Sequence, residues 1–181
     1  MDDKSKKDIP ITSMNKTKSL VLTGLLFAIA IVLSIVENTL PPIIIGVPGV
    51  KLGLSNIAVM YTLFFLSKQQ AFTVALLKAA FVFSTRGLIP AFLSLTGGFL
   101  SLFIMIILMV IFKRKISYLI LSIFGAVFHN IGQLVAVSLV YTSIYIWAYL
   151  PVLLVSGVLA GIATSTLLKF ILPAFEKLGL K

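Results

Sequence analysis

The sequence predicts an all-α integral membrane protein built as a bundle of six transmembrane helices. Of its 181 residues, 60% are hydrophobic and only 11% are charged, whereas soluble domains carry about a quarter charged residues. Long uncharged stretches alternate with short polar or basic segments, at the spacing that membrane-spanning helices require. The chain has no cysteine, so disulfides and thiolate metal sites are excluded. Its length suits one bundle rather than two domains.

The first predicted span is 19–37, which follows a basic tail over 1–18. The span is too long for the apolar core of a signal peptide and no cleavage site follows it, so we expect it to be retained. Two prolines at 41 and 42 then end the helix. The segment 39–51 is apolar but interrupted by glycine and proline, and we expect a broken, re-entrant-like loop that folds back toward the bundle.

Five further spans are expected after this loop. Spans two and three are joined tightly at Ser67–Gln69, which predicts a helical hairpin. Spans five and six are separated by Tyr141–Pro151, whose tyrosines and tryptophan favour the membrane interface. A cytoplasmic tail, 173–181, follows a membrane domain over 19–172. The expected ranges are 52–67, 69–86, 90–112, 117–140 and 149–171.

The basic residues predict the orientation in the membrane. With the N-terminus inside, an even number of spans places only Lys51 and Arg86 outside, and Lys78 lies within a span. This bias places both termini in the cytoplasm and the protein in the cell membrane. The net charge of +10 is then attributed to an anionic membrane face, not to nucleic acid. The cytoplasmic cations would be Lys4, Lys6, Lys7, Lys16, Lys18, Lys68, Lys113, Arg114, Lys115, Lys169, Lys177 and Lys181.

Polar residues inside the membrane part are the candidates for ligand binding, because such residues are costly there and usually face a cavity or a partner. Glu37 is either an interfacial residue that caps a helix end, or it contacts a ligand or pairs with Lys51 or Arg86. Lys78 falls halfway along the third span, where a charge costs at least ~2.5–3.5 kcal/mol. The full candidate set is Glu37, Lys51, Asn56, Lys78, Arg86, His129, Asn130 and Gln133.

His129, Asn130 and Gln133 lie close together on the fifth span. They are either hydrogen-bonding links between helices or a ligand-binding row. Span one carries two small-x-x-x-small pairs that would let a partner helix approach closely. These residues are Gly24, Ala28, Ala30 and Ser34. Small residues in spans four and six are expected to serve packing inside the bundle.

Several activities lack the residues they need. There is no G-x-x-x-x-G-K-[ST] phosphate loop, and one histidine without cysteine provides no zinc site. The only adjacent acids, Asp2 and Asp3, lie in the basic tail, so a magnesium-diphosphate cluster is missing. We therefore expect no enzyme activity, no metal and no cofactor.

Three motifs are similar to those of a known family: P-G-V-K-L-G-L-S-N at Pro48–Asn56, L-S-L-T-G-G at Leu93–Gly98 and G-A-V-F-H-N-I-G-Q at Gly125–Gln133. Together they resemble the Gx transporter family, often labelled heptaprenyl diphosphate synthase component I. The likeness covers about Leu20–Leu172. That family is similar to the S components of energy-coupling factor (ECF) transporters, six-helix proteins that capture a vitamin-like molecule from outside.

This resemblance implies a T subunit and two ATPase subunits as partners. It also implies that small residues of the first helix meet the T subunit and that the following loop covers the ligand. The favoured hypothesis is a substrate-binding subunit for a small vitamin-like or anionic ligand, such as a flavin nucleotide or a prenyl or quinone precursor. One alternative is a non-catalytic membrane component of isoprenoid or quinone (heptaprenyl diphosphate) synthesis, and another is a small channel or secondary carrier. The sequence does not identify the ligand.

Overall fold

The computed structural model describes residues 16–39, 53–112, 116–141 and 144–177. Within these ranges all regular structure is helical, which confirms the predicted all-α class. The loop predicted at 39–51, which includes Lys51, lies outside the described residues except for Thr39. The elements are α1 (Lys16–Thr39), α2 (Asn56–Phe65), α3 (Lys68–Arg86), α4 (Leu88–Ile111), α5 (Tyr118–Tyr141), the 3-10 helix η1 (Ile144–Tyr149) and α6 (Leu150–Lys177).

Four of these helical segments are long and apolar enough to cross a membrane. They are α1, α4, α5 and the segment Tyr145–Phe170, which contains most of α6. Helix α2 has 10 residues and is about 15 Å long, half the thickness of the hydrocarbon core. Helix α3 has 19 residues, but its lysines and glutamines lower its apolar content. The prediction of six spans is therefore supported for four, although the described chain does contain six α-helices.

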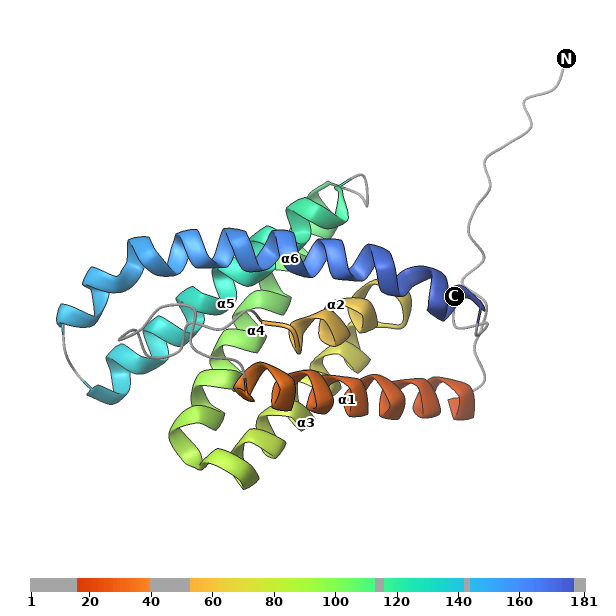
Figure 1. Ribbon diagram of the computed structural model, residues 1–181, viewed down its shortest axis with the longest axis horizontal. Helices are drawn as coiled ribbons and strands as arrows, with labels where there is room; N and C mark the ends of the chain where they lie inside the picture. Colours follow the sequence, from red (N-terminus) through yellow and green to blue (C-terminus); the bar gives the residue numbers. More distant parts are fainter. Residues whose placement is uncertain (1–15, 40–52, 113–115, 142–143, 178–181) are drawn as a thin grey trace, which may run out of the picture.

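The helices form one bundle in which α5 packs between α4 and α6, while α1 packs against α2 and α3. The start of α1 and the end of α6 lie at the same end of the molecule, and the end of α5 and the start of α6 lie at the other (Figure 1). One hydrophobic core joins five helices through fully buried side chains. These are Leu26, Met60, Val74, Leu102 and Leu168.

Glycines set the closest helix crossings. A Cβ added at Gly132 of α5 would lie 2.8 Å from Cα of Gly97 in α4. A Cβ added at Gly161 of α6 would lie 2.4 Å from Cα of Ile123 in α5. Such close backbone approach requires residues without a side chain at these points. The prediction that small residues in α4 and α6 serve internal packing is confirmed.

The turns explain where the helices begin and end. Ser67 accepts a hydrogen bond from the Gln70 backbone N–H at 3.2 Å, which caps α3 and makes the predicted tight hairpin with α2. The predicted break between α5 and α6 is present as η1, and Tyr145 there is exposed. Helix α6 runs through Pro173 to Lys177, so it extends into the residues predicted as a tail.

Candidate functional site

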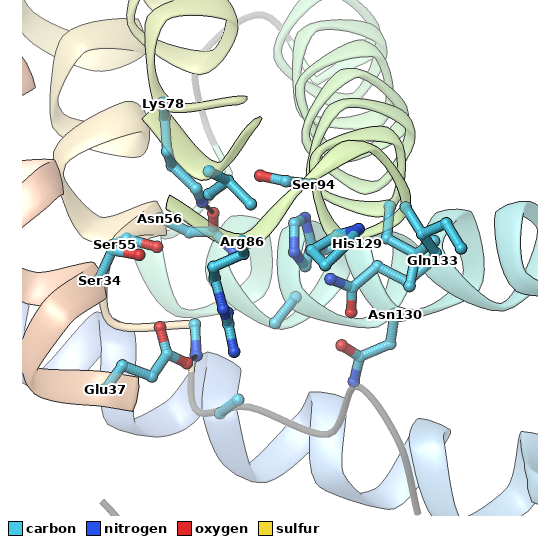
Figure 2. Close-up of a pocket in the computed structure, with 17 residues that line it drawn as sticks. Ser34, Glu37, Ser55, Asn56, Lys78, Arg86, Ser94, His129, Asn130 and Gln133 are labelled. Atoms are coloured by element: carbon cyan, nitrogen blue, oxygen red, sulfur yellow. Dashed lines mark hydrogen bonds between the residues drawn. The ribbon is translucent and has the colours of Figure 1, made fainter. Parts of the chain in front are cut away.

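A cavity of about 200 Å³ lies inside the bundle and is lined from α1, α2, α3, α4, α5 and α6. Figure 2 shows its polar side chains arranged around one space. Seven of the eight candidate ligand residues line it, and the eighth, Lys51, lies outside the described residues. The seven are Glu37, Asn56, Lys78, Arg86, His129, Asn130 and Gln133.

Lys78 places a positive charge deep in this cavity. Its side chain is only 6% exposed, and it lies at the middle of α3. Its Nζ donates a hydrogen bond to Oδ1 of Asn56 at 2.8 Å. Because Asn56 is the first residue of α2, the ammonium group is held beside the N-terminus of that short helix.

Glu37 joins the end of α1 to the start of α2. Its buried carboxylate accepts a hydrogen bond through Oε1 from the backbone N–H of Gly53. Gly53 has a φ of 72°, a conformation that favours glycine, and its carbonyl accepts from the N–H of Asn56. Glu37 therefore lines the cavity and also fixes the turn that leads into α2.

Arg86 contributes the second cation of the cavity from the last residue of α3. Unlike Lys78, its residue is exposed. Gly87 follows with a φ of 89° and separates α3 from α4. In Figure 2, the Arg86 guanidinium and the Glu37 carboxylate extend toward the same side of the cavity.

The side chains of α5 form the opposite wall of the cavity (Figure 2). His129 is buried and Gln133 is half-buried. Asn130 links helices, because its Nδ2 donates to the Leu153 carbonyl of α6 at 3.0 Å and to Ser156 Oγ at 3.4 Å. Asn130 thus links α5 to α6, as one of the two predicted roles requires. All three residues line the cavity, and their role in ligand binding stays a prediction.

Gly97 leaves room for this wall. A Cβ at position 97 would lie 2.9 Å from Cγ of Gln133 and 3.0 Å from Cε1 of His129. A side chain on α4 at this point would displace both cavity residues. Gly97 therefore positions the site as well as the helices.

Several lining residues were not among those predicted from the sequence. Ser34, Ser55 and Ser94 add hydroxyl groups to the wall, and the apolar part consists of Val82, Ile89, Pro90, Leu93, Ala126 and Ala160. Ser34 lies three residues before Glu37, so helical spacing puts both on one face. Ser94 falls within the L-S-L-T-G-G motif. These two signals were available in the sequence.

The four small residues predicted to contact a partner helix divide between two faces of α1. Gly24 and Ala28 are exposed, while Ala30 is fully buried and Ser34 is buried at the cavity. At about 100° per residue, Ala30 and Ser34 point well away from Gly24. The prediction of a partner contact is therefore corrected for Ala30 and Ser34, which pack within the chain, and it remains a proposal for Gly24 and Ala28.

The charges of the cavity favour anions. Its charged lining side chains, within the part of the chain that the structure describes, are Lys78, Arg86 and Glu37, a formal charge of +1 with histidine neutral. No group of three or more histidine, cysteine or acidic residues that could hold a metal occurs among the described residues. The site thus offers two cationic donors, amides and hydroxyls for binding rather than a metal centre.

The fold and the cavity define a class of protein: an all-helical membrane protein whose bundle contains a cavity lined by basic, amide and hydroxyl side chains. The family model of heptaprenyl diphosphate synthase component I matches residues 26–171, and the chain belongs to this family. The resemblance inferred from the three motifs is thereby confirmed, and the matched range includes every residue that lines the cavity. No match to the chain was found among curated proteins or among solved structures.

Proposed function

We propose that this protein is the substrate-binding S subunit of an ECF-type transporter and that its cavity captures a small anionic ligand. The observation that carries the proposal is the convergence of polar side chains from five helices, α1 to α5, on a single cavity in a bundle with long apolar helices. Ionisable and amide groups inside a bundle of membrane helices are usually functional.

Lys78 and Arg86, the two cations that line the cavity, would bind the negative charge of the ligand. An acidic group placed between Lys78 and Arg86 would accept hydrogen bonds from both side chains. Hydrogen bonds between charged groups are about twice as strong as those between neutral ones. The N-terminus of α2, beside Lys78, adds a favourable dipole for a negative charge.

The size of the cavity limits the ligand. About 200 Å³ is below the ~300–1,000 Å³ of sites for drug-sized molecules. A flavin nucleotide and a prenyl or quinone precursor are the candidates that the sequence suggested. Of these, the compact precursors fit the cavity better than a nucleotide or a long polyprenyl chain.

Transport would draw on partner proteins for energy, a T subunit and two ATPases, since the sequence contains no phosphate loop. The exposed small residues Gly24 and Ala28 offer a surface on α1 that another helix can approach closely. In the cell membrane, with both termini cytoplasmic, Glu37 and Arg86 would lie toward the outside. The cavity would then receive its ligand from that side.

Copurification tests this proposal. A tagged chain, expressed in its native cell, should retain a T subunit and ATPases, and Gly24→Leu or Ala28→Leu should reduce their recovery. Val32→Leu is the control, because Val32 is exposed on the same helix but is already bulky. Absence of such a complex, together with harmless substitutions at Gly24 and Ala28, would contradict the proposal.

A second candidate function follows from the family description, which names a component of a prenyl diphosphate synthase. The chain would then be a non-catalytic membrane component that anchors a soluble synthase at its cytoplasmic face. In that case Ala substitutions at Lys68 and Lys113–Lys115 should abolish heptaprenyl diphosphate synthesis, while Lys78→Ala should have no effect. The reverse pattern favours ligand capture.

A further inference from the structure

We infer that the cavity selects a small monocarboxylate, and that Glu37 determines this choice by excluding phosphate-bearing ligands. The inference rests on the proposed function, since it specifies the ligand of the same cavity. It follows from the balance of charges, the position of Glu37 and the space available.

The balance of charges favours a monoanion. The described lining has two cations, Lys78 and Arg86, and one acid, Glu37. One negative charge on the ligand neutralises this set. A phosphate monoester carries a charge of about −1.5 to −2 at pH 7 and would leave excess negative charge beside buried groups, which is costly in a medium of low polarity.

Glu37 already accepts a hydrogen bond from a backbone N–H that could otherwise bind an anion. Anions bind well at helix N-termini because backbone N–H groups point at them. In the turn that leads into α2, the Gly53 N–H donates to the Glu37 carboxylate. The Lys78 ammonium donates to Asn56, the first residue of that helix. A resident carboxylate thus lies at the place where the second negative charge of a phosphate would be stabilised.

The volume of the cavity and the residues opposite Lys78 limit the part of the ligand beyond its carboxylate. A carboxylate near Lys78 leaves a body of limited size within about 200 Å³. The body would contact Ile89, Pro90 and Leu93, and its polar end would face His129 and Gln133. The ligand class is therefore a small ring or short chain with one carboxylate and one hydrogen-bonding group.

Two matched probes test the selectivity. With the full-length protein in lipid nanodiscs, calorimetry would measure the Kd of 4-hydroxybenzoate and of 4-hydroxyphenyl phosphate, with neutral 4-hydroxybenzamide as control. Wild type should bind the carboxylate most tightly. Glu37→Gln keeps an oxygen that can accept from Gly53 but removes the charge, so the Kd ratio should move about tenfold in favour of the phosphate.

Arg86→Gln is the second variant, at an exposed position where loss of folding is not expected. It removes a cation, so the ratio should move the opposite way, toward the carboxylate. Preference of wild type for the phosphate, or a ratio that both variants leave unchanged, would overturn the selectivity inference. The anion site itself would still stand if Lys78→Gln weakened both anionic probes. Failure of wild type to bind either anion would overturn the anion site and the inference with it.

Discussion

The crossing of α4 and α5 allows a quantitative prediction for Gly132→Ala. The added Cβ would lie 2.8 Å from Cα of Gly97, 2.9 Å from the Thr96 carbonyl oxygen and 3.1 Å from the Gly97 nitrogen. Carbon atoms in good contact are about 3.5–4.0 Å apart, so the shortfall is about 0.7 Å or more. All three atoms belong to the backbone and cannot rotate away. The two helices must therefore separate.

The free energy of unfolding should fall by about 1–3 kcal/mol, the usual cost of inserting a methyl group into a tightly packed core. The better helix propensity of alanine offsets at most about 1 kcal/mol of this loss. Because Gly97 also adjoins Gln133 and His129, separation of the helices should weaken ligand binding as well. Thermal unfolding of the purified protein and a Kd measurement would detect the two effects.

Gly24→Ala is the matched control, since a Cβ there meets nothing within 4 Å. It should be neutral or slightly stabilising in the isolated chain. If Gly132→Ala were as stable as Gly24→Ala and bound ligand equally well, the close crossing of α4 and α5 would not hold the cavity in place. The reasoning from backbone contact would then be refuted.

Three further substitutions probe the cavity and its supports. Lys78→Met should weaken the binding of an anionic ligand roughly 10- to 100-fold, as loss of a charged hydrogen bond does. The melting temperature should not fall, because an apolar side chain suits this buried position. An unchanged Kd would contradict the role of Lys78 in binding. Gly53→Ala should lower the free energy of unfolding by about 1 kcal/mol, because alanine disfavours a positive φ. It should also weaken ligand binding by displacing Asn56, whose Nδ2 would lie 3.1 Å from the new Cβ. Gly24→Ala again serves as control, and a Gly53→Ala variant as stable as wild type would exclude strain at this turn. Asn130→Ala should cost about 0.6 kcal/mol, the average for a hydrogen bond between membrane helices, in chemical unfolding, whereas a loss of binding with no loss of stability would make Asn130 a ligand contact instead of a link between α5 and α6.

The helices were predictable because uncharged runs bounded by lysines, prolines and glycines mark them directly. Helix α2 shows where that signal ends. The apolar run begins before Asn56, but the helix starts only after the Gly53 turn, and hydropathy contains no information about a backbone turn. The count of six spans included this helix, which has 10 residues, and the structure supports four of the six spans.

The candidate site was predictable because polar groups at membrane depth are few. The direction in which a side chain points was harder to predict. Gly24 with Ala28 and Ala30 with Ser34 have the same spacing, yet one pair is exposed and the other is buried. Spacing identifies a shared face of a helix but not the element that covers the face, since this depends on the packing of α2 and α3 against α1.

The fifth helix bears on the choice between ligand capture and anchoring of a synthase. Gly125, His129, Gly132 and Gln133 follow one another at intervals that keep them on one side of α5. On that side the glycines meet α4, and His129 and Gln133 line the cavity. Packing and cavity chemistry thus share a single face of α5. An anchor for a soluble enzyme would use polar groups at its cytoplasmic ends, such as Lys68. It gives no role to the polar groups that surround a cavity inside the bundle. The internal placement of His129 and Gln133 therefore favours ligand capture.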